Sequence, residues 1–157
     1  MNNMKKLLSI ITLLLIVIGL TGCTMKYPEL DENAIAFTVS SYVDEEHDNA
    51  SYLTIEYNGR TYLPYGTQKG ILQSKDLDKC IGYIVQDENS SSIVDPDNKD
   101  TRIYTLTEDK DNNFLMEYYI GTNEMNDPIF YRAMDTKGKD ITIPKIIDGP
   151  NDNYWKS

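Results

Sequence analysis

The chain has 157 residues, and its 25 acidic and 15 basic side chains give a formal net charge of −10 at pH 7. This balance, without a cluster of Lys or Arg, argues against a phosphate-binding surface, so no nucleic-acid partner is expected. The only histidine, His47, lies in the acidic segment DEEHDN, which excludes a zinc site with two or more histidine ligands and a histidine-based catalytic triad.

The N-terminal segment has the pattern of a secretory signal. Lys5 and Lys6 precede the almost wholly apolar run Leu7–Leu20, and a basic start followed by about 14 apolar residues is typical of such signals. A membrane-spanning helix needs roughly 20 apolar residues, so this run is short for an anchor. Residues 1–22 are therefore expected to form an apolar signal helix that is removed, with an uncleaved anchor as the alternative.

The end of the apolar run, Leu20-Thr21-Gly22-Cys23, resembles the lipobox of bacterial lipoproteins: an aliphatic residue, two small residues and Cys. The resemblance implies cleavage after Gly22 and a covalent diacylglycerol on the Cys23 thiol, which is the only cofactor-like group expected. Two acyl chains suffice for stable anchoring. The expected location is the cell membrane, with the lipid-anchored chain facing outside the cytoplasm.

Removal of residues 1–22 leaves 13 basic and 25 acidic residues, a net charge of −12. Such a charge predicts repulsion from anionic lipid headgroups, which would hold the domain off the membrane. It also suggests a cationic protein or peptide as a partner, the alternative being an ordinary solvated acidic surface.

The mature chain has the size of one domain. Residues 23–33 are expected to be the lipidated cysteine and a short polar tether, and residues 34–157 a single extracytoplasmic β-rich domain. Cys80 is the only other cysteine, so a lipidated Cys23 leaves it without a disulfide partner. Because Cys80 lies beside Ile81 and near Ile84, we expect a buried structural thiol.

Short runs of β-branched and aromatic residues predict strands along the whole chain, at Ala34–Val43, Tyr52–Tyr57, 60–65, 80–86, Arg102–Thr107, Phe114–Ile120 and Ile129–Met134. Asn58-Gly59 is a strong signal for a type I′ hairpin. Pro64 lacks a backbone donor, which predicts that its strand ends there or lies at a sheet edge.

Outside these runs, Ser74–Asp78 predicts one helical turn, and Tyr154 and Trp155 are expected to pack against the domain from a surface tail. No stretch of the mature chain keeps a period of 3.6 residues. The predicted class is therefore all-β, a small antiparallel β-sandwich or barrel of about seven strands.

The segment Asp109-x-Asp111-x-Asn113 has the spacing of the first three ligands in a calcium loop. Phe114 stands where an EF-hand needs Gly, and Ile120 where it needs Glu. These residues are weak metal candidates, and an ordinary turn between two strands is the preferred interpretation.

Twelve tyrosines offer a second kind of candidate site. Tyr57, Tyr62 and Tyr65 surround the predicted hairpin and are a candidate binding set for sugars or aromatic ligands. The alternative is cross-strand packing, where an apolar ring with a polar tip suits half-buried positions.

The region from YNGRTYLPYGT to FYRAMDTKGKDI is similar to a family of small Gram-positive lipoproteins to which no activity is assigned. Two shorter motifs resemble those of the membrane-bound lysozyme inhibitors, which are small lipoprotein β-barrels. The segment Asn58–Tyr62 matches S-G-x-x-Y except at its Ser, and Tyr131–Gly138 matches Y-x-x-x-T-K-G with one extra residue. The cysteines that bridge many inhibitors are absent here.

These observations predict a non-enzymatic, membrane-anchored binding or interaction module of the cell envelope. An inhibitor or immunity protein against a cationic wall enzyme or peptide is one specific version. The alternative is an envelope hydrolase that works through two carboxylates, which would have to face each other across a cleft.

Overall fold

The computed structural model describes residues 26–47, 49–85, 98–121 and 127–156. The predicted signal helix, Cys23 and most of the polar segment before Thr101 lie outside these residues.

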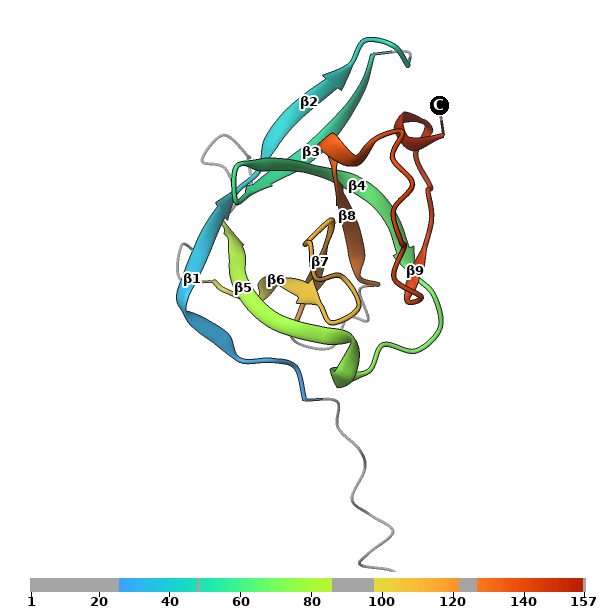
Figure 1. Ribbon diagram of the computed structural model, residues 1–157. Coiled ribbons are helices and arrows are strands. Elements are labelled where there is room, and N and C mark those ends of the chain that lie inside the picture. The colour runs from blue at the N-terminus through green and yellow to red at the C-terminus, as the bar shows by residue number, and fades with distance from the viewer. Residues whose placement is uncertain (1–25, 48, 86–97, 122–126, 157) are drawn as a thin grey trace, which may run out of the picture.

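Nine strands form one sheet within the described residues (Figure 1). They are β1 Leu30–Thr38, β2 Ser40–Asp44, β3 Ala50–Tyr57, β4 Arg60–Gln68, β5 Leu77–Val85, β6 Thr101–Leu106, β7 Phe114–Tyr119, β8 Ile129–Ala133 and β9 Ile147–Asp148. Three short 3-10 turns complete the fold: η1 Ser74–Asp76, η2 Met134–Thr136 and η3 Asn153–Trp155. The predicted all-β class is confirmed.

The strand order is β1-β5-β6-β7-β8-β4-β3-β2, with β9 added on β4. All these pairs are antiparallel except β1 and β5, which are parallel. Over the described residues the sheet curls but does not close into a barrel (Figure 1). The strand count exceeds the predicted seven because Ala34–Val43 divides at Val39 and because the tail contributes β9.

The hairpin between β3 and β4 turns at Asn58-Gly59, as predicted. Both residues have positive φ, 50° and 73°, which a type I′ turn requires. The prediction for Pro64 was wrong, since β4 continues to Gln68 and lies between β3 and β8. The register shifts between Pro64 and Gly66, and an irregularity of this kind accommodates a proline that cannot donate.

Two apolar clusters cover opposite faces of the sheet, because successive side chains of a strand alternate. On β7, Phe114 and Met116 belong to the first cluster and Leu115 to the second. Cys80 is buried in the first cluster, as predicted, and burial raises the pKa of its thiol.

The C-terminal segment packs over the first cluster. The Trp155 indole Nε1 donates to the Pro64 carbonyl at 2.7 Å, and the rings of Tyr154 and Trp155 meet edge to face at 4.8 Å. The buried Arg132 guanidinium lies 5.0 Å from the Trp155 ring. The prediction that these two aromatic residues pack against the domain is confirmed.

The N-terminal end joins the same cluster. The Tyr27 ring stacks on that of Tyr118 at 5.0 Å, and Leu30 on β1 lies opposite Cys80 on β5. The sheet therefore begins at Leu30, inside the segment 23–33 that the sequence suggested as a tether.

Candidate functional site

The hairpin of β2 and β3 forms an arm at one end of the molecule, at the top of Figure 1. We call residues 40–57 the acidic arm, and its outer end, Asp44–His47, the acidic tip. β2 stands at the end of the strand order, so it is an edge strand that presents backbone groups. The described chain starts at the opposite end, at the bottom of the same view.

A close polar pair organises the acidic tip. His47 Nδ1 and Asp44 Oδ2 are 2.7 Å apart, and the Glu46 N–H donates to Asp44 Oδ1 at 3.1 Å. Burial acts to raise the pKa of Asp44, but these hydrogen bonds, together with the charges of His47 and Lys137, outweigh it and lower that pKa. The Asp44 carboxylate thus fixes the turn, while Glu45 and Glu46 remain exposed.

Aromatic residues hold the inner face of the arm against the C-terminal segment. The rings of Tyr42 and Tyr52 meet the Tyr154 ring at 5.9 Å and 6.3 Å, both edge to face. Lys137 Nζ lies 4.0 Å from the centre of the Tyr154 ring. Burial and the charges of Asp152 and Asp44 raise the pKa of Tyr52. The arm is therefore packed rather than a free projection.

The outer face of the arm combines apolar and acidic groups. Val43 is 49% exposed and Leu53 is 60% exposed. They point to the same side as Ser41 and Ser51, whose hydroxyl oxygens are 3.0 Å apart across the two strands. Two apolar side chains next to the exposed carboxylates of Glu45 and Glu46 are suited to a partner that is both cationic and partly apolar.

The tip also gathers possible cation ligands. One ligand atom from each of Asp44, Glu46 and His47 lies within 4.8 Å of the others. Carboxylate and imidazole groups bind divalent cations. In this structure Asp44 is already satisfied by His47 and by a backbone N–H, with the positive charge of Lys137 also acting on it.

The predicted tyrosine set does not form one exposed surface. Tyr62 and Tyr65 are 0% and 1% exposed and belong to different clusters, on opposite faces of the sheet. Tyr57 is half-buried and packs near Phe37, with ring centres 6.2 Å apart. Burial raises the pKa of Tyr62 to about 12, against the lowering effect of Arg60.

The predicted metal candidates lie in the turn before β7. Asp109 Oδ2 accepts the Phe114 N–H at 2.6 Å, and Asn113 donates to Asp109 Oδ1 at 3.4 Å. Arg60 donates to the Asp111 carbonyl and to Asn113 Oδ1, each at 3.0 Å. A guanidinium group thus already contacts the oxygen atoms of this turn.

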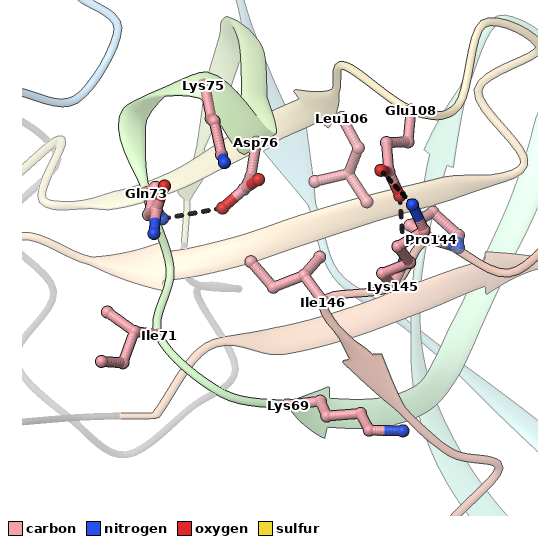
Figure 2. Close-up of a pocket in the computed structure, with 10 residues that line it drawn as sticks. All are labelled: Lys69, Ile71, Gln73, Lys75, Asp76, Leu106, Glu108, Pro144, Lys145 and Ile146. Carbon is pink, nitrogen blue, oxygen red and sulfur yellow. Dashed lines mark hydrogen bonds and ion pairs between the residues drawn. The ribbon is translucent and has the colours of Figure 1, made fainter.

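A groove of about 320 Å³ lies elsewhere, where the loop after β4 meets β6 and the segment before β9 (Figure 2). We call it the lysine groove. Its lining includes Lys69, Ile71, Lys75, Leu106, Lys145 and Ile146. Backbone hydrogen bonds join its walls, from the Lys69 N–H to the Ile146 carbonyl at 2.7 Å and from the Thr107 N–H to the Asp76 carbonyl at 2.9 Å.

Two carboxyl groups also line the lysine groove, Asp76 and Glu108 (Figure 2). Asp76 Oδ2 accepts the Gln73 N–H at 2.8 Å. Glu108 Oε2 accepts the Lys145 N–H at 3.1 Å, and Glu108 Oε1 lies 3.8 Å from Lys145 Nζ. Each of these carboxylates holds a loop in position.

Sequence reasoning did not identify the acidic arm's outer face or the lysine groove. The alternation around Val43 and Leu53 marks one side of a strand, but only the position of Tyr154 decides which side is covered. The groove joins residues from three distant segments, for which local sequence carries no signal.

A scan against protein-family models, a search of curated proteins and a search of solved structures each gave no match. Among the residues that the structure describes, no helix has the length and apolar character needed to cross a membrane.

Proposed function

We propose that the protein is a lipid-anchored lipoprotein of the cell envelope that binds a cationic protein or peptide through its acidic arm. The Leu20–Cys23 lipobox supports the anchor, a diacylglycerol on Cys23, and the location outside the cytoplasm. The binding role is non-enzymatic and rests on the chemistry of the arm.

The observation that carries the proposal is the position of the acidic tip relative to the start of the described chain. β1 begins at Leu30 and leads through β2 to Asp44, at the opposite end of the molecule (Figure 1). A lipid on Cys23 would attach the protein to the membrane at the end where β1 starts, opposite the acidic tip. The exposed Glu45 and Glu46 would then face away from the membrane, where envelope partners approach.

The outer face of the arm indicates the chemistry of the partner. Exposed Glu45 and Glu46 attract a basic surface, and exposed Val43 and Leu53 accept its apolar side chains. The free edge of β2 can also pair with an extended backbone segment. An amphipathic cationic peptide or a cationic wall-degrading enzyme has these properties, which fits an inhibitor or immunity protein.

The resemblance to lysozyme inhibitors makes a lysozyme a suitable probe. The two segments that carry the resemblance lie side by side, since Tyr62 pairs with Ala133 and Arg60 Nη2 donates to Asp135 Oδ1 at 2.8 Å. A carboxylate-dependent hydrolase fits the lysine groove poorly, because Asp76 and Glu108 are each engaged by a backbone N–H.

The proposal is tested by measuring binding of the full lipidated protein, in detergent, to a lysozyme and to a cationic amphipathic peptide. The variant Glu45→Gln/Glu46→Gln should weaken binding at low salt by roughly fivefold. High salt should weaken wild-type binding, because exposed charges are screened.

The matched control is Glu29→Gln/Glu32→Gln, which removes the same charge from exposed residues near the start of the described chain. It should leave binding unchanged. Equal losses in the two variants would reduce the effect to net charge and contradict a role for the arm. Absence of binding to both probes at low salt would contradict the proposal as a whole.

A further inference from the structure

We infer that the lysine groove faces the membrane and binds the headgroups of anionic phospholipids, with Ile71 entering the lipid interface. This inference rests on the proposed lipid anchor at Cys23. It assigns a partner to the end of the molecule opposite the acidic tip.

The length of chain between Cys23 and Tyr27 limits how far the domain can lie from the membrane. Tyr27 is fixed to the domain by stacking on Tyr118 at 5.0 Å. Four residues of chain lead from Cys23 to Tyr27, and they reach at most about 14 Å when fully extended. A lipid on Cys23 would therefore hold the surface around Tyr27 close to the headgroups, too near for the domain to leave the interface.

Tyr27 and the lysine groove lie at the same end of the sheet. Because β1 and β5 are parallel and Leu30 lies opposite Cys80, the start of β1 lies near the start of β5. η1, whose residues line the groove, directly precedes β5. Tyr27 and the groove residues Leu106 and Ile146 pack in the same apolar cluster, hence on the same face of the sheet.

Three lysines line the groove. Lys69, Lys75 and Lys145 stand around an apolar floor that includes Leu106 and Ile146 (Figure 2). All three lysines are exposed. The carboxylates of Asp76 and Glu108 each accept a backbone N–H but keep their charge, and Glu108 Oε1 lies 3.8 Å from Lys145 Nζ, so the groove lining has a net charge of +1. Ammonium groups above an apolar floor complement a phosphate joined to a glyceride.

Exposed apolar side chains lie beside the lysines of the groove. Ile71 is 84% exposed, the highest fraction among the large apolar side chains of the described residues, and Ile143 is 40% exposed. Ile71 lines the groove, and Ile143 directly precedes the groove residue Pro144. Apolar side chains beside basic ones are typical of surfaces that rest in the headgroup region.

This arrangement modifies the expectation of repulsion drawn from the net charge of −12. Charge is not spread evenly, since the exposed ionisable side chains of the tip are Glu45 and Glu46, whereas three lysines line the groove together with two acids. Glu29 and Glu32 also lie near the anchored end, so the attraction is local to the groove. It should accordingly depend on the anionic lipid content and fall with salt.

The test uses the lipidated protein in vesicles of phosphatidylcholine, with or without phosphatidylglycerol. An environment-sensitive fluorophore is attached to Ile71→Cys or, as a control on the acidic arm, to Leu53→Cys. The buried Cys80 thiol, whose pKa is raised, should not react in the folded protein. Quenching by spin-labelled lipids reports how close each position lies to the bilayer.

The label at position 71 should be quenched at least about twofold more than that at position 53, and more strongly when phosphatidylglycerol is present. Lys69→Gln/Lys75→Gln should remove the effect of phosphatidylglycerol. The matched control Lys139→Gln/Lys156→Gln, on exposed lysines that do not line the groove, should retain it.

Equal quenching at positions 71 and 53 would overturn the orientation. Quenching that does not respond to phosphatidylglycerol or to the groove lysines would overturn headgroup binding. Neither result bears on the anchor, because the mass of the mature protein shows separately whether Cys23 carries diacylglycerol. Unfolding temperatures of all variants establish that they are folded.

Discussion

Glu117 on β7 shows how one side chain can make stability depend on pH. Its carboxylate accepts a hydrogen bond from the Tyr131 hydroxyl at 2.6 Å, on the face of the sheet that carries the second apolar cluster. Burial raises the pKa of Glu117, and the hydrogen bond from Tyr131 opposes that shift. Since the folded pKa lies above the unfolded one, the folded state binds the proton more tightly. The ionised carboxylate therefore destabilises the fold at neutral pH.

The first prediction concerns Glu117→Gln. The amide can still accept the Tyr131 hydroxyl but cannot ionise, so the variant should be more stable than wild type at pH 7 by about 1 kcal/mol, or roughly 4 °C in Tm. The advantage should disappear near pH 4, below the ordinary glutamate pKa of about 4.3. Thermal unfolding at both pH values measures it.

Tyr131→Phe serves as the comparison for this prediction. It removes the donor and leaves the carboxylate unpaired, so its stability should fall below wild type at pH 7. A Glu117→Gln variant less stable than wild type at pH 7 would mean that the carboxylate supports the fold.

At the scale of elements, the pairing of β1 with β5 depends on a glycine. A Cβ built on Gly82 would lie 2.1 Å from the Ile35 carbonyl oxygen and 2.6 Å from the Phe37 ring. Both neighbours belong to β1, and Ile35 is the Cα partner of Gly82 in the ladder. Gly82 thus allows the edge strand to approach its neighbour.

The second prediction follows from this close approach. Gly82→Ala should destabilise the fold by roughly 3 kcal/mol, because β1 must move away or strain. The matched control is Gly59→Ala in the β3–β4 turn, where no atom lies within 4 Å of the added Cβ and only the positive φ of 73° is penalised. Its cost should be about 1 kcal/mol, and urea unfolding compares the two. Equal costs would show that the contact with β1 is unimportant.

How much of the fold was predictable also becomes clear at this scale. The Asn58-Gly59 turn follows from backbone chemistry and was predicted correctly. Local alternation located most of the strands, but not the break at Val39 or the short strand β9. The parallel pairing of Leu30 with Cys80 was not predicted, because it joins residues far apart in sequence. The prediction for Pro64 was wrong because the ladder has a bulge there, so no backbone N–H is required from the proline. No local sequence pattern indicates such a bulge.

The same limit applies to the candidate site. Sequence reasoning selected the tyrosines near the hairpin as candidates and noted the acidic segment only as the surroundings of His47. It did not foresee that Tyr62 and Tyr65 fill opposite sides of the sheet while Tyr42 and Tyr52 support the arm. Which side of a strand is covered depends on the C-terminal segment, and a pattern of period two does not contain that information.

On the scale of the whole molecule, the two ends differ in chemistry. One end combines exposed carboxylates with Val43 and Leu53, and the other combines lysines with Ile71. With an anchor at Cys23, the first end would meet partners and the second would meet lipid. The net charge of the whole chain therefore does not describe the chemistry of either end.

The third prediction tests the proposed anchor itself. Cys23→Ser removes the thiol that would accept diacylglycerol, so an unlipidated or unprocessed precursor should result, which differs from wild type in mass and in a detergent-partition assay. The sheet begins at Leu30, and Tyr27 before it stacks on Tyr118, so the described packing starts four residues after Cys23. The variant's unfolding temperature should therefore match wild type. An unchanged mass and partition would refute lipidation at this residue.

The hydrogen bond between Trp155 and Pro64 has a consequence for the timing of folding. It spans 91 positions of the chain, and the ladder of β4 with β8 joins residues 62 to 71 positions apart. Closing such long loops costs entropy before any contact repays it, which makes folding slow. If the chain is exported N-terminus first, the core around Tyr65 can close only after Trp155 has emerged. Translocation and processing would thus act on an unfolded chain, and the chain would reach its native state only after both steps.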